Sequence, residues 1–103
     1  MKDDMDELKE LLCGQRLLFN TGRVVITRNA LDKVPPLDVQ NGIRRHTQGD
    51  WGDLVEEDRL SNERALVDDG QLLSVYQATT GQKFWIITEW DRSATTILLP
   101  EDY

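Results

Sequence analysis

The single histidine of the chain precedes two acidic residues that could share a metal ion or a proton with it. His46 is followed by Asp50 and Asp53. Imidazole and carboxylate groups are metal ligands and general acid–base catalysts, so an enzyme centred on these residues is one hypothesis. The alternative is that His46 borders the apolar stripe of a helix and stabilises the helix C-terminus, where positive charge is favoured. Because one histidine is weak ground for a site, we expect no metal and no catalytic residue.

Acidic residues are concentrated between residues 50 and 70, where eight of them stand against two arginines. Carboxylates of this kind could hold Mg²⁺ or act as acid and base, but most acids on a helix are simply solvated. Tryptophan is enriched at protein interfaces, although Trp51 could instead fill the core between two helices. We predict a protein-interaction surface formed by Asp50, Trp51, Asp53, Glu56, Glu57 and Asp58.

Arg44 and Arg45 are the strongest argument for nucleic-acid binding. They lie on a predicted helix that follows the break at Val34-Pro35-Pro36, an arrangement that superficially resembles a helix-turn-helix. The net charge of −7 and the acidic flank would repel phosphate. A nucleic-acid-binding regulator is therefore the alternative function. The simpler interpretation is a basic face paired with the acidic helix at 53–69.

Other motifs that carry chemistry are missing. The sequence holds neither a glycine-rich phosphate loop nor a Gly-x-Ser-x-Gly elbow, and Ser93 falls in a predicted turn, so we expect no cofactor.

One cysteine excludes an internal disulfide. The N-terminus is acidic, unlike a signal peptide, and apolar runs such as 84–87 are too short to span a membrane. We expect a cytoplasmic protein.

The chain of 103 residues is long enough for one domain. We predict an N-terminal helical extension over residues 1–15 and a single α+β domain over 16–103. The helix of the extension is expected at 3–13, where apolar residues recur at helical spacing: Met5, Leu8, Leu11 and Leu12.

The first part of the predicted domain combines a β-arm with helices. Segments 16–19 and 23–27 suggest a hairpin, and Asn29 can cap a helical turn at 30–33. Pro36 suits the first turn of a helix that runs to about Thr47. Asp53 and Glu56 match a capping-box pattern, which predicts a helix over 53–68.

The last third of the chain predicts three strands, at 72–78, 83–90 and 95–99. Turn residues separate these β-rich runs, as in an antiparallel meander. Helices followed by an antiparallel sheet indicate the α+β class, with the strand at 23–27 as a candidate fourth member. The edge strands of such a sheet permit a dimer but do not require one.

Five segments and the C-terminal tail carry a resemblance to a known family. The segments are 25–27, 44–46 with 49–52, 57–58 with Asn62, 70–74 and 85–89, and the tail is Asp91-Arg92-Ser93-Ala94-Thr95-Thr96-Ile97-Leu98-Leu99-Pro100-Glu101-Asp102-Tyr103. Over residues 24–103 the chain resembles a family of small bacterial proteins carried on plasmids and other mobile elements. Some members are labelled restriction–modification methylation subunits, but Val34-Pro35-Pro36-Leu37 lacks the polar and aromatic residues of a methyltransferase motif.

The resemblance implies a genomic setting and no particular activity. Together with the charge pattern, it favours a non-enzymatic accessory protein that binds a host or plasmid protein. A sharper hypothesis is an inhibitor of a defence nuclease, of the anti-restriction or anti-CRISPR kind, whose acids stand in for DNA phosphates.

Overall fold

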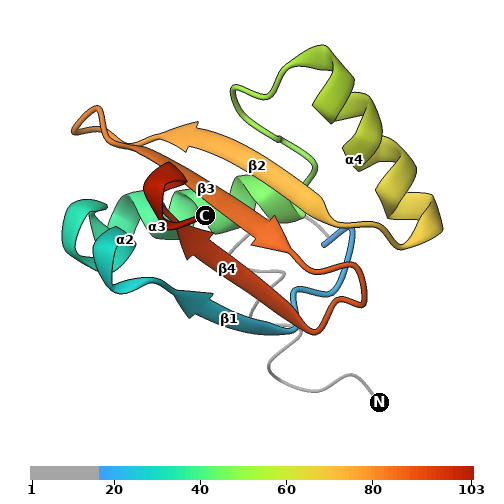
Figure 1. Ribbon diagram of the computed structural model, residues 1–103, viewed down its shortest axis with the longest axis horizontal. Coiled ribbons are helices and arrows are strands. Elements are labelled where there is room, and N and C mark those ends of the chain that lie inside the picture. Colours follow the sequence, from blue (N-terminus) through green and yellow to red (C-terminus); the bar gives the residue numbers. More distant parts are fainter. Residues whose placement is uncertain (1–16) are drawn as a thin grey trace.

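The centre of the molecule is a four-stranded mixed sheet. A computed structural model describes residues 17–103, so the predicted helix at 3–13 lies outside the described residues. The strands are β1 (Arg23–Ile26), β2 (Leu72–Gln77), β3 (Lys83–Thr88) and β4 (Ala94–Leu98). Their order is β1-β4-β3-β2, as Figure 1 shows.

The strand pairings confirm the predicted α+β class and the C-terminal meander. Strands β2, β3 and β4 are antiparallel neighbours, and β1 extends the sheet by pairing in parallel with β4. The predicted hairpin between 16–19 and 23–27 is wrong, because residues 17–19 form no strand. Instead the Leu18 N–H donates to the carbonyl of Thr47, at the end of a helix.

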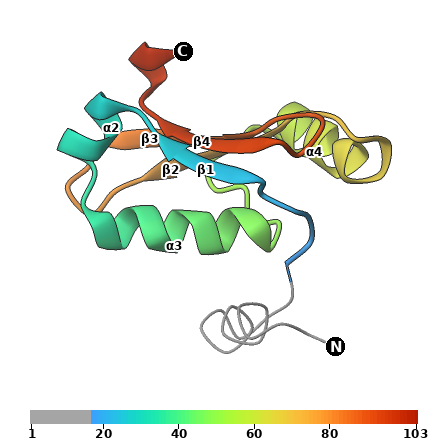
Figure 2. The ribbon, with the colours of Figure 1, turned by 90° about the horizontal axis from the view of Figure 1, so that it is seen from below.

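Within residues 17–103, three α-helices and one short 3₁₀ helix accompany the sheet: α2 (Arg28–Lys33), α3 (Pro36–Thr47), α4 (Glu56–Asp68) and η1 (Pro100–Asp102). Helix α3 lies across one face of the sheet, while α4 lies at one end of the molecule (Figure 2). The predicted helix at 36–47 is confirmed, and so is the end of α4 at Asp68. In the described part of the chain no helix is long and apolar enough to cross a membrane.

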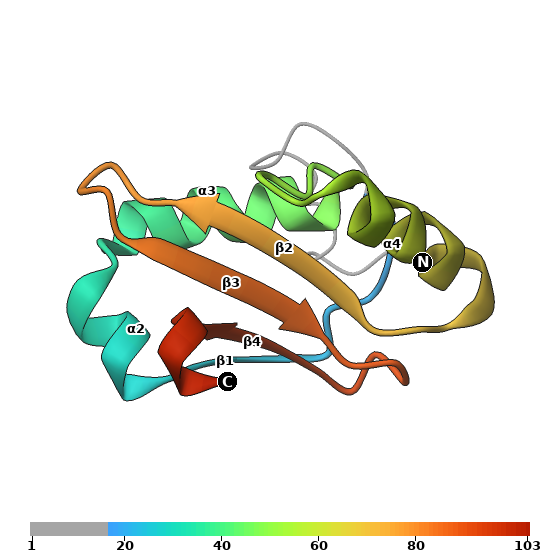
Figure 3. The ribbon, with the colours of Figure 1, turned by 45° about the horizontal axis from the view of Figure 1, so that its top comes forward.

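Two predicted helix caps are wrong. The side chain of Thr27, not that of Asn29, accepts the Ala30 N–H at the start of α2. Both Thr27 and Asn29 donate side-chain hydrogen bonds to Asp102, which joins the start of α2 to η1 (Figure 3). Helix α4 begins at Glu56 with Val55 at the N-cap position and no side-chain cap. Asp53 lies before the helix, and its N–H donates to the Val75 carbonyl.

The core forms two apolar clusters. The larger lies between the sheet and helices α2 and α3, and contains Ala30, Val34, Tyr76, Ala78, Phe84, Ile86, Ile97 and Leu99. The smaller contains Trp51, Leu54, Ala65 and Leu72. Gly42 brings α3 close to the sheet, since a Cβ atom there would lie 3.0 Å from Cε2 of Phe84. This contact explains a helix-interior glycine that by propensity costs about 1 kcal/mol.

Candidate functional site

His46 lies in the core, not at a metal site. Its side chain is fully buried, with the ring edge-on to the rings of Phe19 and Trp51. Nδ1 lies 2.5 Å from the Ser74 hydroxyl and Nε2 lies 2.9 Å from the Thr88 hydroxyl. Asp50 and Asp53 are exposed. The predicted His46–Asp50–Asp53 centre is therefore wrong, because both ring nitrogens already have partners inside the protein.

The hydrogen bonds around His46 determine its tautomer. The Thr95 hydroxyl donates to the Thr21 carbonyl at 2.7 Å, so it must accept from Thr88, also at 2.7 Å. Thr88 therefore accepts from His46, which places the imidazole proton on Nε2 and leaves Nδ1 to accept from Ser74. Burial, reinforced by the positive charge of Arg92, lowers the pKa of His46 to about 3. This neutral chain of bonds ties α3 to strands β2, β3 and β4.

Trp51 also belongs to the core. Its side chain is 1% exposed and its Nε1–H donates to Glu63 at 3.3 Å. The residue is drawn in because its loop runs beside β2: the Val75 N–H donates to the Trp51 carbonyl, and the Asp53 N–H donates to the Val75 carbonyl. The prediction that Trp51 belongs to a contact surface is therefore wrong. The alternative interpretation, that Trp51 is a core residue, is confirmed.

Arg45 and Asp50 neutralise each other at the end of α3. Two guanidinium nitrogens of Arg45 donate to the carboxylate of Asp50 at 2.7 and 3.2 Å. The guanidinium also lies 4.6 Å from the centre of the Tyr76 ring, whose hydroxyl donates to the Asp50 carbonyl at 2.6 Å. The hydrogen bond from Arg45 lowers the pKa of Asp50 and raises that of Arg45. A basic face paired with the acidic helix was predicted, but the partner of Arg45 is the adjacent loop.

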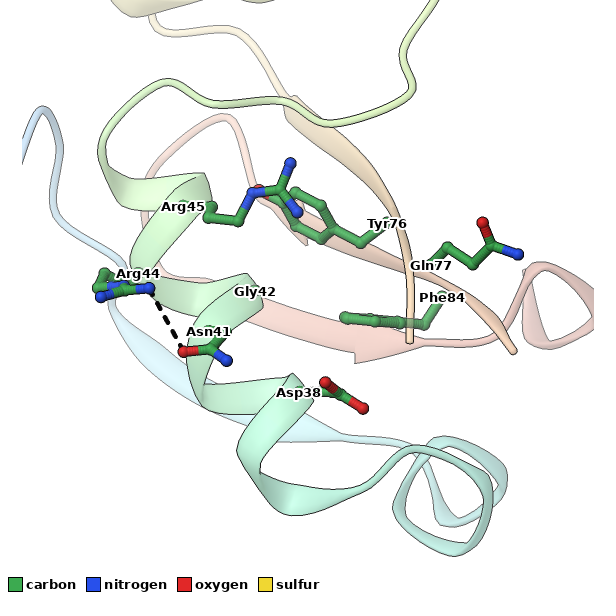
Figure 4. Close-up of a pocket in the computed structure, with 8 residues that line it drawn as sticks. All are labelled: Asp38, Asn41, Gly42, Arg44, Arg45, Tyr76, Gln77 and Phe84. Carbon is green, nitrogen blue, oxygen red and sulfur yellow. Dashed lines mark hydrogen bonds between the residues drawn. The ribbon is translucent and has the colours of Figure 1, made fainter. Parts of the chain in front are cut away.

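A polar cleft opens beside this cluster, between α3 and the strands β2 and β3 (Figure 4). It has a volume of 230 Å³, with Phe84 and Tyr76 on one wall. Its polar groups bond within the protein: Asp38 accepts from the N–H and the hydroxyl of Thr79, and Arg44 lies 3.4 Å from Asn41. The α3 side of the cleft has a signal in the sequence, because the spacing of residues 38, 41 and 45 places them along one side of a helix. Residues from β2 that complete it could not be identified without the fold.

The remaining predicted contact residues lie on what we call the acidic surface. It comprises the exposed carboxylates between residues 53 and 69: Asp53, Glu56, Glu57, Asp58, Glu63, Asp68 and Asp69. Two arginines of α4 are also exposed there, and one of them lies 3.9 Å from Glu56. Within the described residues no group of three histidine, cysteine or acidic side chains is placed to hold a metal ion.

Exposed aliphatic side chains lie among these carboxylates. Val55 is 63% exposed, Leu60 53% and Val67 81%. Helix α4 buries only Asn62 and Ala65 completely, so most of its surface faces outward. The acids follow from the charge pattern of the sequence, whereas the exposure of these aliphatic residues is evident only from the structure.

Comparison with protein-family models, with curated proteins and with solved structures finds no match to this chain.

Proposed function

We propose that this chain is a non-enzymatic protein-interaction module whose acidic surface binds a basic partner protein. The observation that carries this proposal is the composition of the outward face of residues 53–69. Seven exposed carboxylates stand against two exposed arginines, with three exposed aliphatic side chains among them.

This composition suits a protein–protein contact for two reasons. Carboxylates that are not neutralised locally create a negative field, which accelerates encounter with a basic protein and selects against acidic ones. Apolar area is supplied by Val55, Leu60 and Val67. When a partner removes this area from water, the free energy of binding gains roughly 25 cal/mol per Å².

The partner we propose is a host or plasmid protein with a basic surface. In the sharper version it is a DNA-binding defence nuclease, and the acidic surface occupies the place of DNA phosphates. The resemblance to proteins of plasmids and other mobile elements supports that version, because such elements benefit from blocking restriction or CRISPR systems. A cytoplasmic location follows from the same proposal.

A pull-down with the tagged chain tests the proposal. Lysates with and without nuclease treatment are compared, so that proteins held through nucleic acid are distinguished from direct partners. We expect a basic protein that is retained after nuclease treatment and released by raising the salt concentration, because exposed charge contacts are screened. Recovery of nucleic acid alone, lost on Arg44→Ala/Arg45→Ala, would overturn the proposal in favour of a nucleic-acid-binding regulator.

A further inference from the structure

Residues 17–22 form what we call the strap, a segment that passes the C-terminal end of α3 before β1 begins (Figure 2). It belongs to no helix or strand. At one end the Leu18 N–H donates to the Thr47 carbonyl at 2.9 Å. At the other end the Thr21 carbonyl accepts from the Thr95 hydroxyl at 2.7 Å. The strap is thus tied to α3 on one side and to β4 on the other.

Phe19, in the middle of the strap, lies against His46. Its ring is edge-on to the imidazole, with 5.2 Å between the ring centres, and it stacks with the Trp51 ring at 6.4 Å. His46 is fully buried, although Leu17 and Leu18 of the strap are 39% and 55% exposed. A ring that contributes to the burial of His46 therefore belongs to a segment whose adjacent side chains bury little area.

The hydrogen bonds of His46 also lead to the strap. From Nε2 they pass through the hydroxyls of Thr88 and Thr95 to the Thr21 carbonyl, at 2.9, 2.7 and 2.7 Å. A carbonyl can only accept, so Thr21 fixes the direction in which both threonines donate and with it the tautomer of His46. The strap and the imidazole are therefore connected both by ring contact and by hydrogen bonds.

A positive charge on His46 would have no acidic side chain to bond. Within the described residues, its surroundings are hydroxyls, aromatic rings and one guanidinium: Ser74, Thr88, Thr95, Phe19, Trp51 and Arg92. Arg92 lies 5.8 Å from the centre of the Phe19 ring and donates to the carbonyls of Ala65 and Gly70. These bonds hold the positive charge of Arg92 beside the strap.

Titratable groups on the neighbouring elements are engaged with other partners. Glu63 of α4 accepts from the Trp51 Nε1–H. Asp50 binds Arg45 of α3 through its carboxylate and Tyr76 of β2 through its carbonyl. None of these bonds reaches the imidazole, so they do not compensate its charge.

We propose that the strap and His46 form an acid-sensitive closing device, in which the strap docks while His46 is neutral and lifts when it is protonated. Protonation adds a second cation near Arg92 and turns Nδ1 into a donor, so the hydrogen bond that Ser74 donates is lost. Lifting the strap lets water reach the new charge while α3 and the sheet stay folded. Such coupling is reciprocal, so loosening the strap also makes His46 easier to protonate.

Amide hydrogen exchange of the full chain, expressed as protection factors, tests this coupling. Leu18 reports on the strap, and Ile86 in the central strand β3 reports on global unfolding. Between pH 7.5 and 5 the protection of Leu18 should fall roughly thirtyfold, as a pKa of about 3 in the closed state and roughly 6.5 in the open state require. In His46→Gln this pH dependence should disappear.

Two results of that experiment would overturn the proposal. Leu18 should be much less protected than Ile86 at every pH, because local opening costs less than global unfolding. Equal protection of the two amides would show that the strap opens only when the whole protein unfolds. A thirtyfold fall that persists in His46→Gln would show that another group controls the strap.

A matched pair of substitutions separates the strap from general loss of stability. Phe19→Leu acts on the ring against His46, whereas Phe84→Leu acts in the larger core cluster. Phe19→Leu should lower the protection of Leu18 roughly tenfold and raise the pKa of His46 in an NMR titration of the imidazole. Phe84→Leu should lower the protection of Ile86 and leave Leu18 and the His46 pKa unchanged. Identical effects of the two substitutions would overturn the proposal.

Discussion

At the scale of single residues, His46 joins three strands and a helix through hydrogen bonds that are complete only when its ring is neutral. The Nδ1 atom accepts from Ser74, so a proton added there would have to displace that bond inside the core. The low pKa of about 3 reflects the free-energy cost of adding this proton in the folded protein. His46 thus acts in the stability of the fold and takes no part in the proposed binding.

Because of this residue alone, the free energy of unfolding should decrease as the pH is lowered. A histidine with a pKa of about 3 in the folded state and roughly 6.5 in the unfolded state binds fewer protons when folded. Its contribution is complete above about pH 6.5 and decreases as pH falls toward 3. Between pH 7.5 and 5 the free energy of unfolding in urea should decrease by about 2 kcal/mol.

The matched variant for this prediction is His46→Gln. His46 is the only histidine in the chain, so no other imidazole titrates between pH 7.5 and 5. The carboxylates whose pKa values are lowered, such as Asp50 and Asp102, affect stability at lower pH. The variant should be less stable throughout but nearly insensitive to pH in that window. Equal pH slopes for the two proteins would contradict the assignment of a neutral, buried His46.

Gly52 is the residue that allows the loop at 50–53 to lie against β2. Its φ is +75°, and a Cβ atom would lie 2.0 Å from the Val75 carbonyl oxygen. Gly52→Ala should therefore destabilise the protein by about 3 kcal/mol or more, through both backbone strain and a clash. Gly81 has a φ of +94° with no atom within 4 Å of such a Cβ. Gly81→Ala should therefore lower the free energy of unfolding by only about 1 kcal/mol. Equal urea midpoints for Gly52→Ala and Gly81→Ala would argue against the clash at Gly52.

At the scale of elements, α4 is attached to the sheet through few contacts, and Asn62 makes the most specific of them. Its amide bonds both backbone groups of Leu73 and is buried. Arg92, from the β3–β4 turn, donates to the carbonyls of Ala65 and Gly70 at the other end of the helix. The position of the acidic surface depends on these two side chains.

Asn62→Ala should lower the free energy of unfolding by about 2–4 kcal/mol, because it leaves two backbone groups of an edge strand without partners. It should also increase light scattering over time, since the β2 edge becomes available for pairing. The neighbouring exposed residue gives the control, and Ser61→Ala should change stability by less than about 0.5 kcal/mol. Unchanged stability and scattering in Asn62→Ala would refute the role of this side chain.

The elements themselves were largely predictable because they depend on local pattern. Turn residues and β-branched runs located three strands, and Pro36 located the start of α3. Pairing between distant segments was not predictable, since β1 joins β4 across the chain. Thr27 rather than Asn29 caps α2 because the helix begins at Arg28, which places Asn29 inside the first turn. Among the site residues, the exposed acids follow from charge, whereas the burial of Trp51 and the roles of Asn62 and Arg92 depend on tertiary contacts.

At the scale of the whole molecule, exposed negative charge is concentrated in one region of the described residues. Residues 53–69 form the acidic surface at the end occupied by α4. Arg45 and Asp50 form a neutral pair between α3 and the following loop. The acidic surface is therefore the region that the proposed function assigns to a basic partner protein.

A binding comparison between two variants of equal net charge tests that assignment most directly. Glu56→Lys/Glu57→Lys reverses two acids of the acidic surface, and Asp32→Lys/Glu101→Lys reverses two exposed acids elsewhere. After circular dichroism confirms folding, each variant and the wild type are used in the nuclease-treated pull-down, with the recovered proteins quantified by mass spectrometry. The account predicts a partner recovered by the wild type and by Asp32→Lys/Glu101→Lys but reduced about tenfold or more with Glu56→Lys/Glu57→Lys. Equal recovery by both variants would contradict it.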